Sequence, residues 1–359
     1  MRRPAFLVEF AYLRAAAIVA VIVIHAVDTP VITGSAGPLL WPYVAVDVAA
    51  HFAVPLFVFV SGAVLMHVHP PPVGWRPFVP RRLARLLPPY LAVSAVYLLV
   101  RALMEGPPTV LEIVVRLLTG TAYFHLWFVV LVVELALLYP VLAPRVRSAR
   151  PRTLALLGVP LALLATAYFL LKVLIFLAQP DWVLSAVLLQ GLAPAGYLLF
   201  FVAGMAVTAH PDAAGRLMAG LTPGRAATAV LVALLLGASR FAASLDPSPV
   251  RLVLAGLSFL AEPYAYLLAF GLALAAARHP FLRSRPRLSR GLVALGGASY
   301  GIYLVQGGII DLVIGALARI GLGPTSAGYL PATALATLVL SWGVVVLAAR
   351  AVRSLPGKG

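Results

Sequence analysis

Cysteine is absent from this sequence of 359 residues, and charged residues are scarce. The lack of cysteine excludes disulfide bonds and thiolate metal sites, and we predict no metal ion. Only 11% of the residues are charged, whereas 62% are hydrophobic, and the mean hydropathy is +1.02. A soluble domain is about one-quarter charged. The composition therefore excludes an ordinary soluble protein and indicates a chain that lies in a membrane.

Acidic residues are the rarer charged class, with 11 Asp and Glu against 27 Lys and Arg and a formal net charge of +16. A basic chain can bind nucleic acid, but here the basic residues are sorted along the sequence. With the N-terminus placed in the cytoplasm, 20 of the 27 fall on the cytoplasmic side and five on the other. Membrane proteins show this asymmetry. We therefore expect contact with membrane lipid and no nucleic-acid partner.

Apolar segments long enough to cross a bilayer as helices, about 20 residues each, recur along the chain. We predict an all-α polytopic membrane protein of about ten transmembrane helices, with both termini cytoplasmic, forming one domain over residues 1–359 in the cell (plasma) membrane. The first segment lacks a small-residue cleavage site, so we interpret it as a retained span. The segments are 8–27, 43–66, 84–103, 122–143, 153–177, 190–209, 226–244, 250–276, 292–318 and 329–349.

Two polar residues, Arg14 and His25, stand in the first apolar segment. Eleven helical residues turn through about three full turns, so the two side chains share a face, roughly 16 Å apart along the axis. Arg14 could instead reach the inner headgroups, and His25 could merely satisfy a buried acceptor. Ionisable groups inside a membrane are costly and usually functional. The shared face favours a functional pair, with Asp28 following near it.

Five motifs carry a resemblance to a known family. The first is Arg14-x10-His25. The others are "HFAVPLFVFVSGAVLM" (51–66), "RRLARLLPPYL" (81–91), "HLWFVVLVVELALLYPVL" (125–142) and "GGASYGIYLVQ" (296–306). Together, and in this order, they resemble the acyltransferase-3 family of multi-pass membrane acyltransferases over most of the chain. One departure is Gln306, where the family commonly has histidine; a glutamine amide can form hydrogen bonds but cannot titrate near neutral pH.

The resemblance implies transfer of an acyl group, usually acetyl, from cytoplasmic acetyl-CoA to a hydroxyl of a cell-surface or lipid-linked glycan. Such a reaction needs a base for the hydroxyl proton, or an imidazole that carries the acyl group. His25 is the candidate for either role. The sequence does not specify the acceptor's identity or the oligomeric state.

The donor's phosphates would suit guanidinium groups. Arg81, Arg82 and Arg85 lie just before the third apolar segment, on the predicted inner face, and Arg14 is a further candidate for the donor. Ordinary positive-inside charge explains the three arginines equally well. We expect "PPY" (88–90) to break or kink the start of this helix and to open a cavity there.

Asp47 and His51 are four residues apart, hence neighbours on one helix face. We take Asp47 as a candidate catalytic residue that orients His25, because a carboxylate fixes the tautomer of an imidazole. A local Asp47–His51 contact is the alternative. His51 is itself a candidate for binding the acceptor.

The other acceptor-binding candidates are His125, Glu134 and Gln306. Glu134, with Glu262 and Asp311, lies within the predicted spans, where a carboxylate needs a partner, water or a proton. These three could line a substrate passage or act as polar contacts between helices. A transporter of a glycan or lipid, without acyl transfer, is the alternative function, and a non-catalytic relative is a third.

Overall fold

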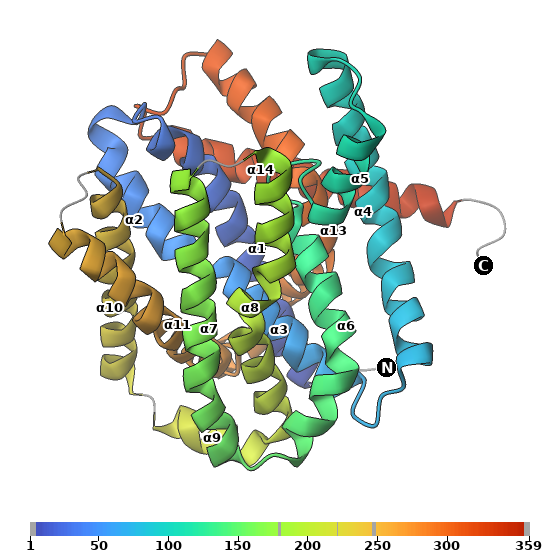
Figure 1. Cartoon of the computed structure of the whole chain (residues 1–359), viewed down its shortest axis with the longest axis vertical. Helices are drawn as coiled ribbons and strands as arrows, with labels where there is room; N and C mark the ends of the chain where they lie inside the picture. The colour runs from blue at the N-terminus through green and yellow to red at the C-terminus, as the bar shows by residue number, and fades with distance from the viewer. Residues whose placement is uncertain (1–4, 179–180, 221, 246–248, 355–359) are drawn as a thin grey trace. The chain divides into compact units, whose positions relative to one another are not determined.

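The computed structural model describes residues 5–178, 181–220, 222–245 and 249–354, and its regular elements there are all helices (Figure 1). The helices are α1 (Ala5–Ile32), the 3-10 helix η1 (Gly37–Leu39), α2 (Leu40–Ala50), α3 (Ala53–Val68), α4 (Trp75–Glu105), α5 (Val110–Thr119), α6 (Trp127–Ser148), α7 (Pro151–Ala178), α8 (Trp182–Ala209), α9 (Pro211–Ala219), α10 (Pro223–Leu245), α11 (Pro249–Ala277), α12 (Pro280–Arg283), α13 (Pro286–Arg319) and α14 (Tyr329–Arg353).

The prediction of an all-α polytopic membrane protein is confirmed. Eight helical segments among the described residues are long and apolar enough to cross a membrane. The two further predicted spans, 226–244 and 250–276, are the helices α10 and α11, whose described parts include shorter apolar stretches. The sidedness of the termini stays a prediction that rests on the charge pattern.

Two compact units make up the chain. The terminal unit joins the two ends of the sequence, Met1–Ala53 and Arg278–Gly359, and the central unit is Val54–Ala277. In the terminal unit α1 packs against α2, α13 and α14, and α13 packs against α14. In the central unit α8 packs against α6 and α7, and α10 pairs with α11. Each unit is described by itself below.

Long-range polar contacts hold α1 in the terminal unit. The Tyr12 hydroxyl lies 2.6 Å from Oγ of Ser289, at the start of α13. Nε of Arg278 donates to Oε2 of the buried Glu9 at 2.8 Å. Near the other end of the unit, the Tyr43 hydroxyl donates to the carbonyl oxygen of Pro324. These contacts connect segments more than 260 residues apart, so they hold the N-terminal helices α1 and α2 to the C-terminal part of the unit.

Glycines allow two helix pairs, α1 with α13 and α3 with α8, to approach closely. A Cβ placed on Gly296 of α13 would overlap with the backbone carbonyl of Ala11 on α1. In the central unit, a Cβ on Gly62 of α3 or Gly204 of α8 would overlap with a carbonyl of the opposite helix. Small residues at such crossings replace the hydrophobic driving force that helices lack inside a bilayer. Van der Waals contact between backbones therefore stabilises these pairs.

The helix break that the sequence offered as one possibility at "PPY" does not occur. The helix α4 runs unbroken from Trp75 to Glu105, with Pro88 and Pro89 inside it, so "PPY" does not break the third span. Consequently, Arg81, Arg82 and Arg85 lie inside this helix rather than before it. The helix α13 likewise continues through Gly307 and Gly308.

Candidate functional site

His25 and Asp28 form a side-chain pair on α1 in the terminal unit. Nδ1 of His25 lies 3.1 Å from Oδ2 of Asp28, and both side chains are only partly exposed. A spacing of three residues puts them one above the other on the helix surface. Because an ionised carboxylate can only accept, Nδ1 donates to it. The other ring nitrogen, Nε2, is then the one that carries a lone pair and can take a proton.

A second carboxylate, Asp311 on α13, interacts electrostatically with His25. The parallel course of α1 and α13 brings it there. Thus the imidazole has acidic groups from two helices beside it, and these groups stabilise an imidazolium ion. Sequence analysis placed Asp311 within a predicted span but did not connect it with His25.

Arg14 lies three turns before His25 on the same face of α1, partly exposed like His25. Between them, Ile18 and Val21 are buried, with relative exposures of 0% and 1%. This stretch of the shared face is therefore filled by side chains. A donor arm that reaches from Arg14 to His25 has to displace that packing or pass beside it.

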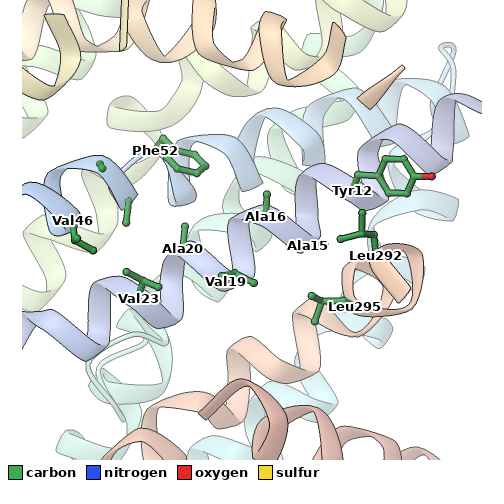
Figure 2. A pocket seen from close by; sticks show the side chains of 12 residues that line it. Tyr12, Ala15, Ala16, Val19, Ala20, Val23, Val46, Phe52, Leu292 and Leu295 are labelled. Atoms are coloured by element: carbon green, nitrogen blue, oxygen red, sulfur yellow. The ribbon is translucent and has the colours of Figure 1, made fainter. Parts of the chain in front are cut away.

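The opposite side of α1 carries an apolar groove of about 600 Å³. Tyr12, Ala16, Val19 and Val23 line it from α1, together with residues of α2 and the side chains of Leu292 and Leu295 from α13 (Figure 2). At about 100° per residue these α1 positions point roughly 150° away from Arg14 and His25. The groove is thus separate from the face that carries the ionisable pair.

Asp47 and His51 contact each other at the end of α2. Nδ1 of His51 lies 2.8 Å from the backbone oxygen of Asp47 and 3.4 Å from its Oδ1. The local contact considered from the sequence is therefore present. The predicted roles of Asp47 toward His25 and of His51 toward an acceptor stay predictions, whereas the carboxylate seen to hold His25 is Asp28.

Gln306 is completely buried in α13, with a relative exposure of 0%. Neither its Nε2 nor its Oε1 has a hydrogen-bond partner among the residues that the structure describes. A glutamine amide carries two donors and an acceptor with two lone pairs. The residue that departs from the family pattern is thus a buried amide in the terminal unit.

The three arginines predicted to bind the donor lie together in the central unit, over the first turns of α4. Arg81 and Arg85 are four residues apart and exposed, and Arg82 is partly buried between them. All three act on one neighbour, His69, which follows α3. Burial lowers the pKa of His69, and the guanidinium groups of Arg82, Arg85 and Arg81 lower it further. The cluster is a concentrated positive site with a neutral imidazole inside it.

The structure places His69 in contact with aromatic side chains. Its ring meets the edge of Phe78 at 5.3 Å between centroids. Its backbone oxygen accepts a hydrogen bond from the hydroxyl of Tyr139. The proximity of "HPPPVGW" (69–75) to "RRLARLL" (81–87) in the sequence was the available signal.

Glu134 has a side-chain partner within the central unit. Nε2 of Gln190 on α8 donates to its Oε2 at 2.9 Å. Lys172 on α7 belongs to the same unit, and its Nζ lies about 6 Å from the ring centroids of Trp127 and Phe169. This hydrogen bond between Gln190 on α8 and Glu134 on α6 is the kind of polar contact that joins helices inside a membrane. Whether Glu134 also binds an acceptor stays a prediction.

His125 is buried among aromatic rings, with a relative exposure of 1%. The rings of Tyr97, Tyr123 and Phe124 surround it, all at steep angles to the imidazole plane. The acceptor-binding role of His125 stays a prediction, and it requires a ligand that enters this aromatic enclosure.

Glu262, the remaining intramembrane carboxylate, accepts a hydrogen bond from Tyr266 one turn along α11. Groups of three or more His, Asp or Glu side chains that could hold a metal ion do not occur among the described residues.

Comparison with known proteins gives one match. A family model described as an acyltransferase domain, of the acyltransferase-3 type, covers residues 7–347. This range takes in parts of both compact units and all five sequence motifs. No curated protein and no solved structure matches the chain significantly.

Proposed function

The chain belongs to the acyltransferase-3 family, and from this premise we propose that it is a membrane O-acyltransferase that moves an acetyl group from acetyl-CoA to a hydroxyl group of a glycan. The acceptor is a cell-surface or lipid-linked glycan, and the enzyme acts in the cell membrane. Membership of the family gives acyl transfer itself; the donor, the acceptor and the location are the proposal.

The observation that carries the proposal is the His25–Asp28 pair on the same helix face as Arg14. With Nδ1 engaged by Asp28, Nε2 of His25 removes the proton from the acceptor hydroxyl. The resulting imidazolium is stabilised by Asp28 and Asp311, as a triad carboxylate stabilises its histidine. The hydroxyl oxygen then attacks the thioester carbonyl carbon. The carbon–sulfur bond breaks, and the CoA thiolate takes up the proton from His25.

The basic residues supply the donor side. Coenzyme A carries a pyrophosphate and a 3′-phosphate, and guanidinium groups bind both through charge-assisted hydrogen bonds. Arg81, Arg82 and Arg85 form a concentrated positive site. The charges that act on the neighbouring His69 come from these three arginines and not from a carboxylate. These arginines hold the nucleotide end, and Arg14 steadies the donor arm.

Release of free CoA tests this function directly. Because the chain has no cysteine, a thiol reagent added to the purified protein and acetyl-CoA reports only the released cofactor. We expect thiol release that depends on a glycan acceptor and that is lost in His25→Ala. Labelled acetyl that stays on quenched protein would make His25 a nucleophile instead of a base. No thiol release, together with movement of a glycan across protein-containing vesicles, would establish a transporter.

A further inference from the structure

The apolar groove beside α1 takes no part in the proposed reaction. Its 12 lining residues are all Ala, Val, Leu, Phe or Tyr, and the Tyr12 hydroxyl is the single polar side-chain group among them. Alanines from α1 and α2 form much of the lining, and their small side chains leave the volume of about 600 Å³ open. A sugar or a nucleotide would lose its hydrogen bonds in such a groove. Its occupant is therefore a hydrocarbon chain.

The length of the groove matches one leaflet of a bilayer. Along α1 it extends from Tyr12 to Val23, which lie toward its two ends (Figure 2). Eleven residues of helix rise about 16 Å. The hydrocarbon core of a bilayer is about 30 Å thick, so this rise is about half of it. The groove therefore suits one lipid chain that enters from one side of the membrane.

Polar groups gather at the end of the groove where Tyr12 lies. The Tyr12 hydroxyl is 2.6 Å from Oγ of Ser289. One turn earlier on α1, and within about 50° of the direction of the groove, Glu9 accepts from Nε of Arg278 at 2.8 Å. The two terminal nitrogens of this guanidinium, Nη1 and Nη2, form no hydrogen bond with a described residue, and the side chain is 38% exposed. Such a pair of donors can bind two oxygens of one phosphate.

The charge at this end of the groove is positive. Ser289, which meets Tyr12, stands between Arg287 and Arg290, and both arginines are exposed. The sequence from Arg278 to Leu292, a residue that lines the groove, contains no Asp or Glu. A local potential of this sign favours an anionic head group over a zwitterionic one.

We propose that the terminal unit binds one anionic phospholipid, with its phosphate on Arg278 and one acyl chain in the groove. This inference does not rest on the proposed function. Nη1 and Nη2 of Arg278 donate to two phosphate oxygens, while Glu9 holds the guanidinium in place through Nε. The acyl chain packs against α1, α2 and α13 together. Because a ligand that binds the folded state stabilises it, the bound lipid raises the melting temperature of the protein.

Binding of defined lipids to lipid-depleted protein in detergent tests the inference. The probes are phosphatidylglycerol and phosphatidylcholine with the same acyl chains. We expect one phosphatidylglycerol per chain, bound about tenfold more tightly than phosphatidylcholine, and a rise in melting temperature. Glycerol 3-phosphate carries the phosphate without the chains, so it should not raise the melting temperature. Stabilisation by glycerol 3-phosphate equal to that by the lipid would show a phosphate site that does not involve the groove.

Two substitutions separate the acyl chain from the head group. Ala16→Leu puts a larger side chain into the groove and should abolish the stabilisation by phosphatidylglycerol. Ala294→Leu, at an exposed alanine of α13 outside the groove, is its control and should keep the stabilisation. Arg278→Gln should bind the two lipids equally. Its control is Arg319→Gln, at an exposed arginine in the last turn of α13, which should keep the preference for phosphatidylglycerol.

Equal affinity of the wild-type protein for the two lipids would overturn the inference. So would an undiminished response to phosphatidylglycerol in Ala16→Leu, or an undiminished preference for it in Arg278→Gln. Arg278→Gln also leaves the buried Glu9 without its partner, so this variant can fail to fold. Arg278→Lys then replaces it, because lysine keeps a charge beside Glu9 but lacks the guanidinium fork. It should bind phosphatidylglycerol several-fold more weakly than the wild-type protein, and wild-type affinity would exclude the phosphate contact.

Discussion

Nδ1 of His25 lies 3.1 Å from Oδ2 of Asp28, one turn further along α1. The pair needs no other part of the fold, because residues three apart on a helix are neighbours. It turns the second ring nitrogen of His25, Nε2, away from this carboxylate. The carboxylate that orients the proposed base is thus local, whereas the one first considered, Asp47, contacts His51.

Removal of the charge on Asp28 should reduce turnover while the protein still folds. We expect Asp28→Asn to lower kcat about 100-fold, because an amide can hold the wrong tautomer of His25. Asp28→Glu should restore part of the activity, and the KM for acetyl-CoA should change little in either variant. The measurement is CoA release under saturating donor.

Asp212, an exposed carboxylate on α9, provides the matched control, and Asp212→Asn should retain wild-type kcat. Asp47→Asn tests the competing assignment directly. A loss of turnover in Asp47→Asn without one in Asp28→Asn would reverse the two roles.

The arginines of α4 should affect donor binding rather than chemistry. Arg85→Gln should raise the KM for acetyl-CoA about tenfold with little change in kcat, since one charge-assisted contact to phosphate is lost. The loss should shrink at high salt, which screens exposed charges. Arg147→Gln, an exposed arginine at the end of α6, is the control. Equal effects of the two substitutions would show that the arginines of α4 act on donor binding only as general surface charge.

His69 should make donor binding depend on pH. Burial and the neighbouring arginines lower the pKa of His69, so the imidazole is neutral at pH 7. As the pH falls through this lowered pKa, His69 gains a proton and adds a positive charge to the cluster. Acetyl-CoA should therefore bind more tightly to the wild-type protein than to His69→Gln at acidic pH, and equally near pH 7.5.

Comparing wild type with His69→Gln at each pH cancels the titration of the donor's own phosphate groups. Binding is measured as displacement of a fluorescent CoA analogue. Parallel pH profiles for the two proteins would exclude His69 from the donor site.

Two adjacent glycines on α13 should respond oppositely to alanine. A Cβ on Gly296 overlaps with the Ala11 carbonyl, whereas a Cβ on Gly297 meets nothing within 4 Å. Gly296→Ala should therefore destabilise the protein by roughly 1–3 kcal/mol, the usual cost of overpacking. Gly297→Ala should be neutral or slightly stabilising, since alanine favours helix. Thermal unfolding in detergent is the measurement, and equal melting temperatures would contradict the close approach.

The sequence predicted the helices from uninterrupted apolar runs, and it was least accurate where local polar chemistry decides a boundary. The predicted span 190–209 belongs to a helix that begins at Trp182, because Asp181 accepts hydrogen bonds from the backbone of Val183 and Leu184 and caps it. Such a cap is readable in principle. The continuity of α4 through its prolines could not be predicted from the sequence. Proline interrupts helices in water, but it is tolerated within membranes where neighbouring groups satisfy the freed backbone groups.

Parts of the candidate site that depend on helical spacing could be read from the sequence alone. The Arg14–His25 face and the Asp47–His51 contact are of this kind. The approach of Asp311 to His25 and the bond between Glu9 and Arg278 could not be read, because nearly the whole chain separates the partners. Such pairs require the packing of α1 with the C-terminal helices to be known first.

The terminal unit is built from the first 53 residues and the last 82, which has a consequence for biogenesis. During synthesis α1 and α2 leave the ribosome long before α13 and α14 exist. Until then Glu9 lacks Arg278, and His25 lacks Asp311. These groups stay in the lipid or near the insertion machinery while the central unit, Val54–Ala277, is synthesised, so a chain truncated before α13 leaves α1 without these polar partners.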